Sequence, residues 1–172
     1  MHTEGDSATK IGKYMGYLAW LIGLALLTAF FSGVLEKQQN PNANPESYMS
    51  GDSTVVKLKR NRYGHYVSSG LINDYPVVFF LDTGATSVSI PQKVAEEIGL
   101  DKGAAAHVKT ANGVITVYET LISRLTLGDI ELTNVAAHIN PQEDEETILL
   151  GMSALKQLEF SQKGNWLTLK QY

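Results

Sequence analysis

The feature that most constrains this chain is a long stretch without charge near its beginning. Residues 14–35 carry no charged side chain, and their few polar members are tyrosines, Thr28 and Ser32. As a helix these 22 residues extend roughly 33 Å, against about 30 Å of hydrocarbon in a bilayer. The stretch therefore predicts a transmembrane anchor over 14–35.

A cleaved signal peptide and a buried core helix are the alternatives for this stretch. The apolar region of a signal peptide usually has about 7 to 15 residues and ends in a small-x-small cleavage site. Here the apolar run is longer and continues through Phe30, Phe31 and Val34 without such a site. This favours a retained anchor.

The lysines around the stretch predict its orientation. Lys10 and Lys13 precede it and Lys37 follows it, and positive charge favours the cytoplasmic side. We expect residues 1–13 to form an N-terminal cytoplasmic tail of a single-pass protein. In a bacterial cell the rest would face the periplasm from the inner membrane, an oxidising space that a cysteine-free chain tolerates.

Composition and motifs exclude several classes of function. The absence of cysteine removes disulfides, thiolate metal sites and cysteine nucleophiles. A net charge of −4 and a pI near 5.5 argue against a nucleic-acid partner. The common phosphate, dinucleotide and serine-hydrolase motifs are absent. The histidines lack metal-ligand spacing, so we expect no metal and no cofactor; they are His2, His65, His107 and His138.

The chain after the anchor divides into a linker and a folded domain. Residues 36–53 are rich in Asn, Gln, Pro, Ser and Gly, which predicts a flexible linker. Residues 54–172 show short β-type runs separated by turn residues, which predicts one all-β domain, mostly antiparallel. About 118 residues are too few for two lobes, and there is no internal repeat.

Turn residues set the expected order of strands. We expect a hairpin around Asn61 and Arg62, one at Asn73 and Asp74, and tight turns at 112–113 and 128–129. Later strands are expected at 108–110, 114–121, 123–127, 130–139, 148–150 and 166–169. Two short helices are expected, one after Pro91 that ends at Gly99, and one at 153–158.

The segment 76–91, PVVFFLDTGATSVSIP, carries the clearest chemical signal. Its apolar run delivers one carboxylate, Asp82, onto a Thr-Gly-Ala turn. A carboxylate at the end of a buried strand is costly unless it is hydrogen-bonded or shared. A simple turn-forming Asp is the alternative for this motif taken alone. A second apolar run enters a glycine and a short helix at 146–160, in ETILLGMSALKQLEF.

Together these segments resemble the retropepsin-like (clan AA) aspartic proteases, in particular their bacterial single-domain, membrane-anchored branch. The resemblance covers residues 54–172. It is carried by Phe80, Leu81, Asp82, Thr83, Gly84 and Ala85, by Leu149, Leu150 and Gly151, and by the sequence VKTANGVITV between them. That last segment looks like the family's flap, a hairpin that closes over substrate, with Ala111, Asn112 and Gly113 at its tip.

The resemblance implies a fold and a mechanism. The implied fold is a single-lobe acid-protease fold, a closed β barrel with short helices. Hydrolysis by this route needs two carboxylates that share a proton. Since the chain has one D-T-G, the resemblance implies a homodimer with one catalytic Asp82 per chain. It also assigns Thr83 to a hydrogen-bonded brace, and Gly84 and Ala85 to support of the active-site loop.

The chain departs from the retroviral pattern at two places that support the dimer. An acid and an arginine pair there in retroviral members, and this chain has Thr86 and Met152 instead. The joint loss avoids an unpaired charge and fits the bacterial branch. Anchoring two copies in one membrane would raise their effective concentration.

Two charged runs admit a functional interpretation beside an ordinary one. Lys57, Lys59, Arg60 and Arg62 could contact anionic lipid, but we favour a solvated strand edge. The acidic loop at 143–146 could repel acidic substrates, but we favour a solvated loop.

The sequence therefore predicts a membrane-anchored, homodimeric aspartic endopeptidase that cleaves a protein or peptide substrate. The alternative is a non-catalytic peptide-binding or dimerisation module with the same fold. A membrane-tethered scaffold is a third possibility. The scaffold predicts indifference to Asp82, whereas the intact residues 82–84 argue against the non-catalytic module, whose site would be free to decay.

Overall fold

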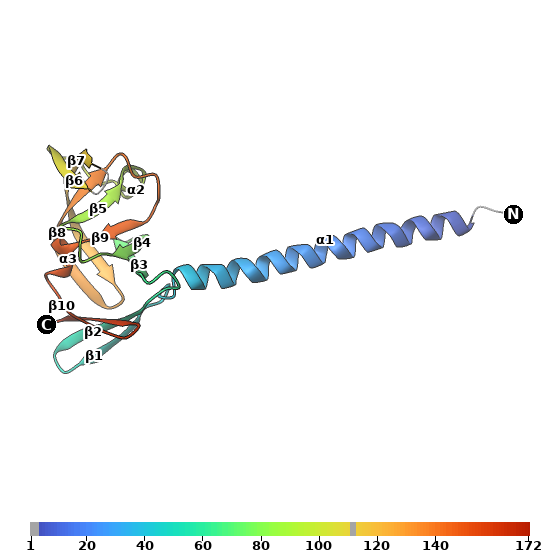
Figure 1. Cartoon of the computed structure of the whole chain (residues 1–172), viewed down its shortest axis with the longest axis horizontal. Helices are drawn as coiled ribbons and strands as arrows, with labels where there is room; N and C mark the ends of the chain where they lie inside the picture. The colour runs from blue at the N-terminus through green and yellow to red at the C-terminus, as the bar shows by residue number, and fades with distance from the viewer. Residues whose placement is uncertain (1–3, 111–112) are drawn as a thin grey trace. The chain divides into compact units, whose positions relative to one another are not determined.

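In the computed structural model, residues 4–110 and 113–172 are described. The chain separates into two compact units, Met1–Lys37 and Gln38–Tyr172. One continuous helix, α1 (Glu4–Gln39), drawn in blue in Figure 1, forms the described part of the first unit and ends two residues into the second. Within the described residues, Gly12–Gln39 is the one helical stretch long and apolar enough to cross a membrane, judged by length and composition. This candidate span contains the stretch expected at 14–35.

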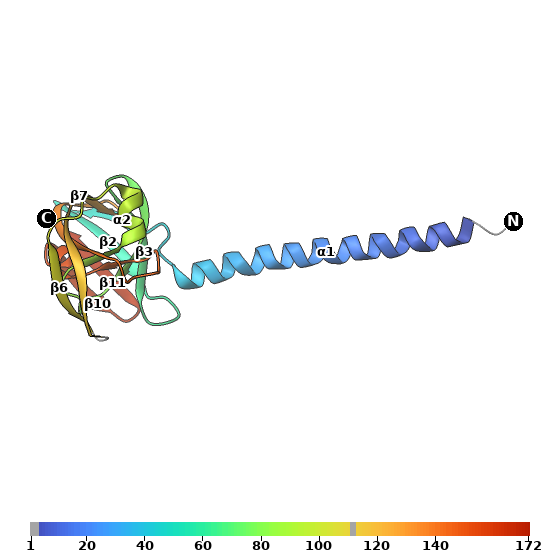
Figure 2. The ribbon, with the colours of Figure 1, turned by 90° about the horizontal axis from the view of Figure 1, so that it is seen from above.

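The second unit is mostly β, as the sequence predicts, with its strands in two sheets (Figures 1 and 2). One sheet has the order β1-β2-β11-β10, and the other has the order β3-β4-β9-β5-β8-β7-β6. The strands are β1 (Glu46–Ser50), β2 (Ser53–Lys59), β3 (Tyr66–Ile72), β4 (Tyr75–Leu81), β5 (Val88–Pro91), β6 (Ala105–Thr110), β7 (Gly113–Leu127), β8 (Ile130–Asn140), β9 (Ile148–Leu150), β10 (Glu159–Lys163) and β11 (Trp166–Gln171). The helices are α2 (Gln92–Ile98) and α3 (Met152–Leu155).

The larger sheet closes on itself. An additional antiparallel pairing joins Leu71 and Ile72 of β3 to Thr126 and Leu125 of β7. This pairing turns the run from β3 to β7 into a ring, with β6 outside it. Most neighbours are antiparallel, whereas β4 with β9 and β5 with β8 are parallel. The closed barrel expected from the sequence is therefore confirmed.

Several local predictions are confirmed by the structure. Asn73 and Asp74 both have positive φ, as a tight hairpin turn between β3 and β4 requires. Residues 128–129 connect β7 and β8, which pair antiparallel. Helix α2 ends at Gly99, whose left-handed conformation (φ 77°) caps it.

The hairpin expected around Asn61 and Arg62 is wrong, because β2 and β3 belong to different sheets. Between them the Asn61 side chain accepts hydrogen bonds from the backbone N–H groups of Tyr63 and His65. This builds a wider loop that carries the chain from one sheet to the other. Other boundaries differ as well. Strand β7 continues through Ser123, and α3 is shorter than the expected 153–158.

The structure also differs from the expected flexible linker at 36–53. Residues 46–50 form β1, which pairs antiparallel with β2. Asn42 is buried, and its side chain bonds to the backbone of Lys59 and Val67. The low content of aliphatic residues did not prevent order, because side-chain and backbone hydrogen bonds hold this segment.

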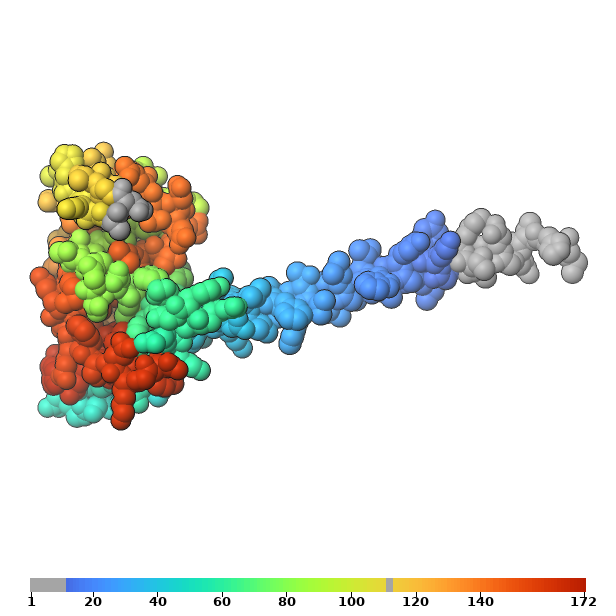
Figure 3. Space-filling view, in the orientation of Figure 1, coloured from blue at the N-terminus to red at the C-terminus, as the bar shows by residue number. Residues whose placement is uncertain are grey.

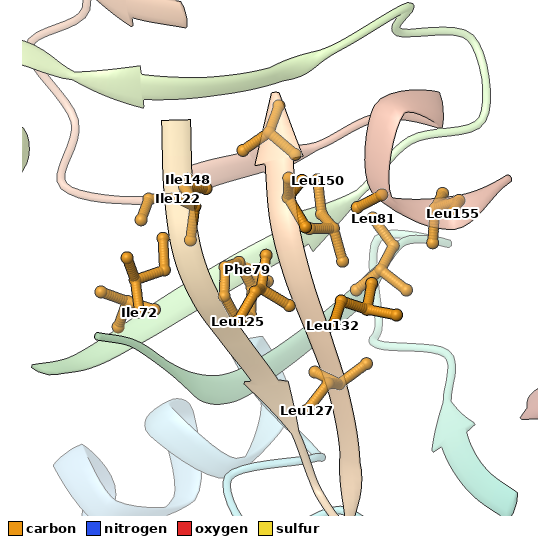
Figure 4. Close-up of a cluster of buried hydrophobic side chains, with 14 of the residues drawn as sticks. Ile72, Phe79, Leu81, Ile122, Leu125, Leu127, Leu132, Ile148, Leu150 and Leu155 are labelled. Carbon is orange, nitrogen blue, oxygen red and sulfur yellow. The ribbon is translucent and has the colours of Figure 1, made fainter. Parts of the chain in front are cut away.

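The core lies between the two sheets and inside the ring. Figure 4 shows Phe79 of β4 in the middle of a group of buried aliphatic side chains. Phe79 and Leu58 of β2 are both fully buried, so both sheets contribute to the same core. Alternate residues of β4 are buried at Val77, Phe79 and Leu81, and this alternation fixes the register of the strand, so Asp82 directly follows its last residue.

Candidate active site

Asp82 and Gly151 are brought together because their strands are parallel neighbours. In the pairing of β4 with β9, Leu81 lies opposite Leu150. The next residues, Asp82 and Gly151, therefore leave the sheet at the same edge. A hydrogen bond from the Asp82 N–H to the Leu150 carbonyl (3.1 Å) joins the two chain segments at this point.

The turn after β4 fixes the Asp82 carboxylate. The Gly84 N–H donates to Asp82 Oδ1 (2.8 Å), and the Ala85 N–H donates to the Asp82 carbonyl (3.2 Å). A Cβ at Gly84 would lie 3.1 Å from Oδ1, so glycine permits this close approach. The carboxylate is half-buried, and Thr83 and Gly84 are exposed. Asp82 is thus held in one orientation at a surface that is open to a ligand.

Gly151 allows the two loops to cross. A Cβ at Gly151 would overlap the carbonyl oxygen of Ser87 and lie 2.8 Å from that of Ala85. The Met152 N–H donates to the Ala85 carbonyl (2.8 Å), and the Ser153 N–H donates to the Thr86 carbonyl (3.0 Å). The loop after Asp82 therefore rests on the first turn of α3, which only a glycine at 151 permits.

A cavity of about 610 Å³ opens beside Asp82. The turn after β4 borders it with Asp82, Gly84 and Ala85, and the β6–β7 hairpin borders it from another side. The loop between β8 and β9 also contributes to its lining. Figure 3 shows the yellow β6–β7 hairpin beside the orange residues near position 140, at the same end of this unit.

Sequence reasoning missed a polar pair in this cavity. Ser87 Oγ lies 2.7 Å from His138 Nδ1, and both side chains line the cavity. The histidine spacing argued only against a metal site and gave no reason to single out His138. Ser87 follows the D-T-G turn by three positions, which is the one sequence signal that could have drawn attention to the pair. Their contact joins β8 to the loop after Asp82.

Comparison with known proteins gives the family. Residues 68–157 match the family described as gag-polyprotein putative aspartyl protease, which is more than half of the chain. The chain belongs to this family. Its fold is also found in a solved structure, a retropepsin-like aspartic protease from Rickettsia conorii. That structure has a TM-score of 0.61 and 25% identity, and the match covers 74% of this chain and 96% of that one.

Two relatives match by sequence. An uncharacterized protein from Sinorhizobium sp., in the 5′ region of cobV, is 29% identical over 170 residues, which are 91% of this chain and 73% of that protein. An uncharacterized protein from Rickettsia prowazekii is 25% identical over 118 residues, which are 67% of this chain and 50% of that protein. The chain therefore spans about half the length of the second relative.

The retropepsin-like fold accounts for where the remaining predicted residues lie. Leu149 lines the cavity, whereas Leu150 is buried in the core and Gly151 supports the loop crossing. Gly113 begins β7 with positive φ (123°). The other two expected flap residues, Ala111 and Asn112, lie outside the described residues. Of the two departures from the retroviral pattern, Thr86 lines the cavity and Met152 packs against the core.

The charges of this family member around the cavity are mainly acidic. Asp82, Glu143 and Glu145 line it, and Lys109 of β6 is the basic residue among its lining. Among the described residues, no group of three or more His, Asp or Glu side chains could hold a metal ion.

An exposed ion pair holds the end of the acidic loop. Lys93 of α2 bonds to Glu146, which raises the pKa of Lys93 and lowers the pKa of Glu146. The stability gained at Glu146 is present above its unfolded pKa and is lost as the pH falls through its lowered folded pKa. The gain at Lys93 is lost as the pH rises through its raised pKa. This exposed pair therefore favours the observed loop path between those limits.

Proposed function

We propose that the protein is a membrane-anchored aspartic endopeptidase that acts as a homodimer, with Asp82 of each chain as its catalytic residue. The observation that carries this proposal is the position of the Asp82 carboxylate. It is fixed by the Gly84 N–H and borders a cavity of about 610 Å³, which is of the size that ligand-binding pockets have.

The chemistry requires a second carboxylate near Asp82. Two carboxylates a few ångströms apart share one proton, because both cannot carry charge at that separation. The ionised one removes a proton from a water molecule, whose oxygen attacks the peptide carbonyl. The protonated one donates to the carbonyl oxygen, and the amine leaves after it receives a proton. Since each chain has one D-T-G turn, the second carboxylate is Asp82 of a partner chain related by a two-fold axis.

The neighbouring residues take supporting roles in this proposal. Thr83 is exposed beside Asp82, where it can brace the loop against its copy in the partner. The β6–β7 hairpin borders the cavity with Val108, Ile115 and Val117, and it would act as the flap over an extended peptide. Excluding water there would strengthen the electrostatic contacts at the carboxylates.

The proposed anchor is α1. Its large apolar side chains are exposed; for example, Trp20 is 80% exposed. The excess of lysines before the span supports a cytoplasmic N-terminus and, in a bacterium, a periplasmic protease domain. Confinement to one membrane would compensate for a dimer that lacks the ion pair at Thr86 and Met152.

Replacing Asp82 by asparagine tests the catalytic role. The Asp82→Asn protein should lose peptide cleavage by a factor of about 10³ or more, since no carboxylate remains to activate water. Circular dichroism and thermal unfolding should stay close to those of the wild type. Asp129→Asn is the matched control, because Asp129 is an exposed turn residue outside the cavity. Equal cleavage by the wild-type and Asp82→Asn proteins would refute the proposal.

A further inference from the structure

The floor of the cavity next to Asp82 is a polar face of the sheet. Strands β5 and β8 run parallel, and Ser89 pairs with His138. Val88 and Ile90 are buried in the core, so Ser89 points to the opposite face. The same alternation along β8 turns His138 and Asn140 away from the core. Ser89, His138 and Asn140 line the cavity. Their polar groups suit a polar ligand group better than a purely apolar one.

His138 is held in place and keeps one ring nitrogen for a bound group. Ser87 Oγ lies 2.7 Å from Nδ1, which orients the ring. An imidazole has a second ring nitrogen, so Nε2 can bond to another group whichever of these two atoms donates. The Asn140 side chain also borders the cavity, and its Oδ1 accepts from the Gln142 N–H (3.0 Å). The floor therefore offers several polar groups in fixed positions.

Acidic groups surround this floor. Glu143 and Glu145 line the cavity from the loop between β8 and β9, and Asp82 lines it from the turn after β4. Glu119 of β7 lies directly opposite His138 in the β7–β8 pairing, so it projects from the same face. Lys109 is the basic residue among the lining. Glu146 lies on the same loop, but its charge is paired with Lys93.

The hairpin adds an apolar wall. Val108, Ile115 and Val117 of the hairpin border the cavity beside these polar groups. An apolar wall next to an acidic, hydrogen-bonding end suits a side chain that has a long alkyl stem and a cationic head. Such a stem packs on the aliphatic side chains while the head reaches the carboxylates.

We infer that this cavity is a specificity subsite that binds a lysine or arginine side chain of the peptide substrate, with Glu143 and Glu145 as the residues that select its charge. The inference rests on the proposed protease function and adds the substrate class to it. A charge-assisted hydrogen bond is about twice as strong as a neutral one, so the charge distinguishes lysine from an uncharged side chain of similar shape.

Cleavage of matched peptides by the full chain in detergent micelles tests the subsite. The peptides carry lysine, norleucine or glutamate at one position, which is moved in turn along each side of the cleaved bond. At the position that enters the cavity, lysine should exceed norleucine by about tenfold in kcat/KM, and glutamate should be the poorest. The double variant E143Q/E145Q should lose the preference for lysine over norleucine. Glu131→Gln, an exposed change at the far end of β8, should retain the preference.

A binding measurement separates the failure of this inference from the failure of the proposed function. The Asp82→Asn chain is titrated against the same peptides, labelled for fluorescence anisotropy. Tighter binding of the lysine peptide, lost in E143Q/E145Q, supports the subsite even if the wild type cleaves no peptide. Cleavage without a preference for lysine, at any position, overturns the inference and leaves the protease function standing. No cleavage together with no selective binding overturns both.

Discussion

At the residue scale, single polar side chains hold the loops that composition alone would leave free. Asn42 is 4% exposed, and it bridges two strands that belong to different sheets. Its Nδ2 donates to the carbonyls of Lys59 (2.9 Å) and Val67 (2.6 Å), and its Oδ1 accepts from the Lys59 N–H (2.6 Å). One side chain thus replaces strand pairing where β2 ends and β3 begins.

Replacing Asn42 by alanine should therefore destabilise the second unit. The change leaves two carbonyls and one N–H without their partner, and a buried unsatisfied group costs about 1–3 kcal/mol. We expect a loss of about 2–4 kcal/mol in the free energy of unfolding. Urea denaturation of residues 38–172 measures it. Asn44→Ala is the control, because Asn44 is exposed and lies two residues further on. An equal loss of unfolding free energy in the Asn42→Ala and Asn44→Ala proteins would contradict this account.

At the element scale, the parallel pairing of β4 with β9 creates the candidate site. The sequence predicted both strands and their glycine-containing turns, because each is a short apolar run that ends at turn residues. It could not predict that β2 and β3 lie in different sheets, since the loop between them is held by hydrogen bonds to the Asn61 side chain. It also missed the contact between Ser87 and His138, which are 51 positions apart and become neighbours only in the folded sheet.

The β6–β7 hairpin gives an element-scale prediction about substrate binding. Ile115 of β7 lines the cavity, whereas its neighbour Val114 is 69% exposed and lies outside the cavity lining. Ile115→Ala should lower kcat/KM for an apolar peptide roughly tenfold, because each buried CH₂ contributes about 0.8 kcal/mol. Val114→Ala should leave it unchanged. Equal effects of the two changes in a peptide-cleavage assay would mean that the hairpin does not cover the substrate.

At the scale of the whole molecule, the chain combines a candidate membrane span with a compact β unit. The two units differ in where their apolar side chains lie. The side chains of α1 from residue 12 onward are exposed and largely apolar, whereas the second unit buries a continuous core. Such an exposed apolar helix is stable when lipid surrounds it. The proposed anchor therefore has a physical basis that is independent of catalysis.

Charges placed in the centre of α1 should release the chain from membranes. An arginine at the centre of a spanning helix costs about 2.5–3.5 kcal/mol, so two at Leu24 and Leu27 should prevent stable insertion. The double variant Leu24→Arg/Leu27→Arg should appear in the soluble fraction after alkaline carbonate extraction. Alanines at the same two positions should leave the chain in the membrane pellet. Release of the alanine variant, or retention of the arginine variant, would speak against a spanning helix.

The central claim is that two copies of the chain form one active site with one Asp82 from each. Mixing wild-type and Asp82→Asn chains tests it most directly. Dimers of each kind are dissociated into single chains, mixed in equal amounts in detergent and allowed to reassociate. If both carboxylates are needed, only about one dimer in four is active, and the cleavage rate per mole of chain falls to about one quarter of the wild-type rate. A fall to about one half, in proportion to the wild-type chains present, would mean that each chain acts alone and would contradict the account.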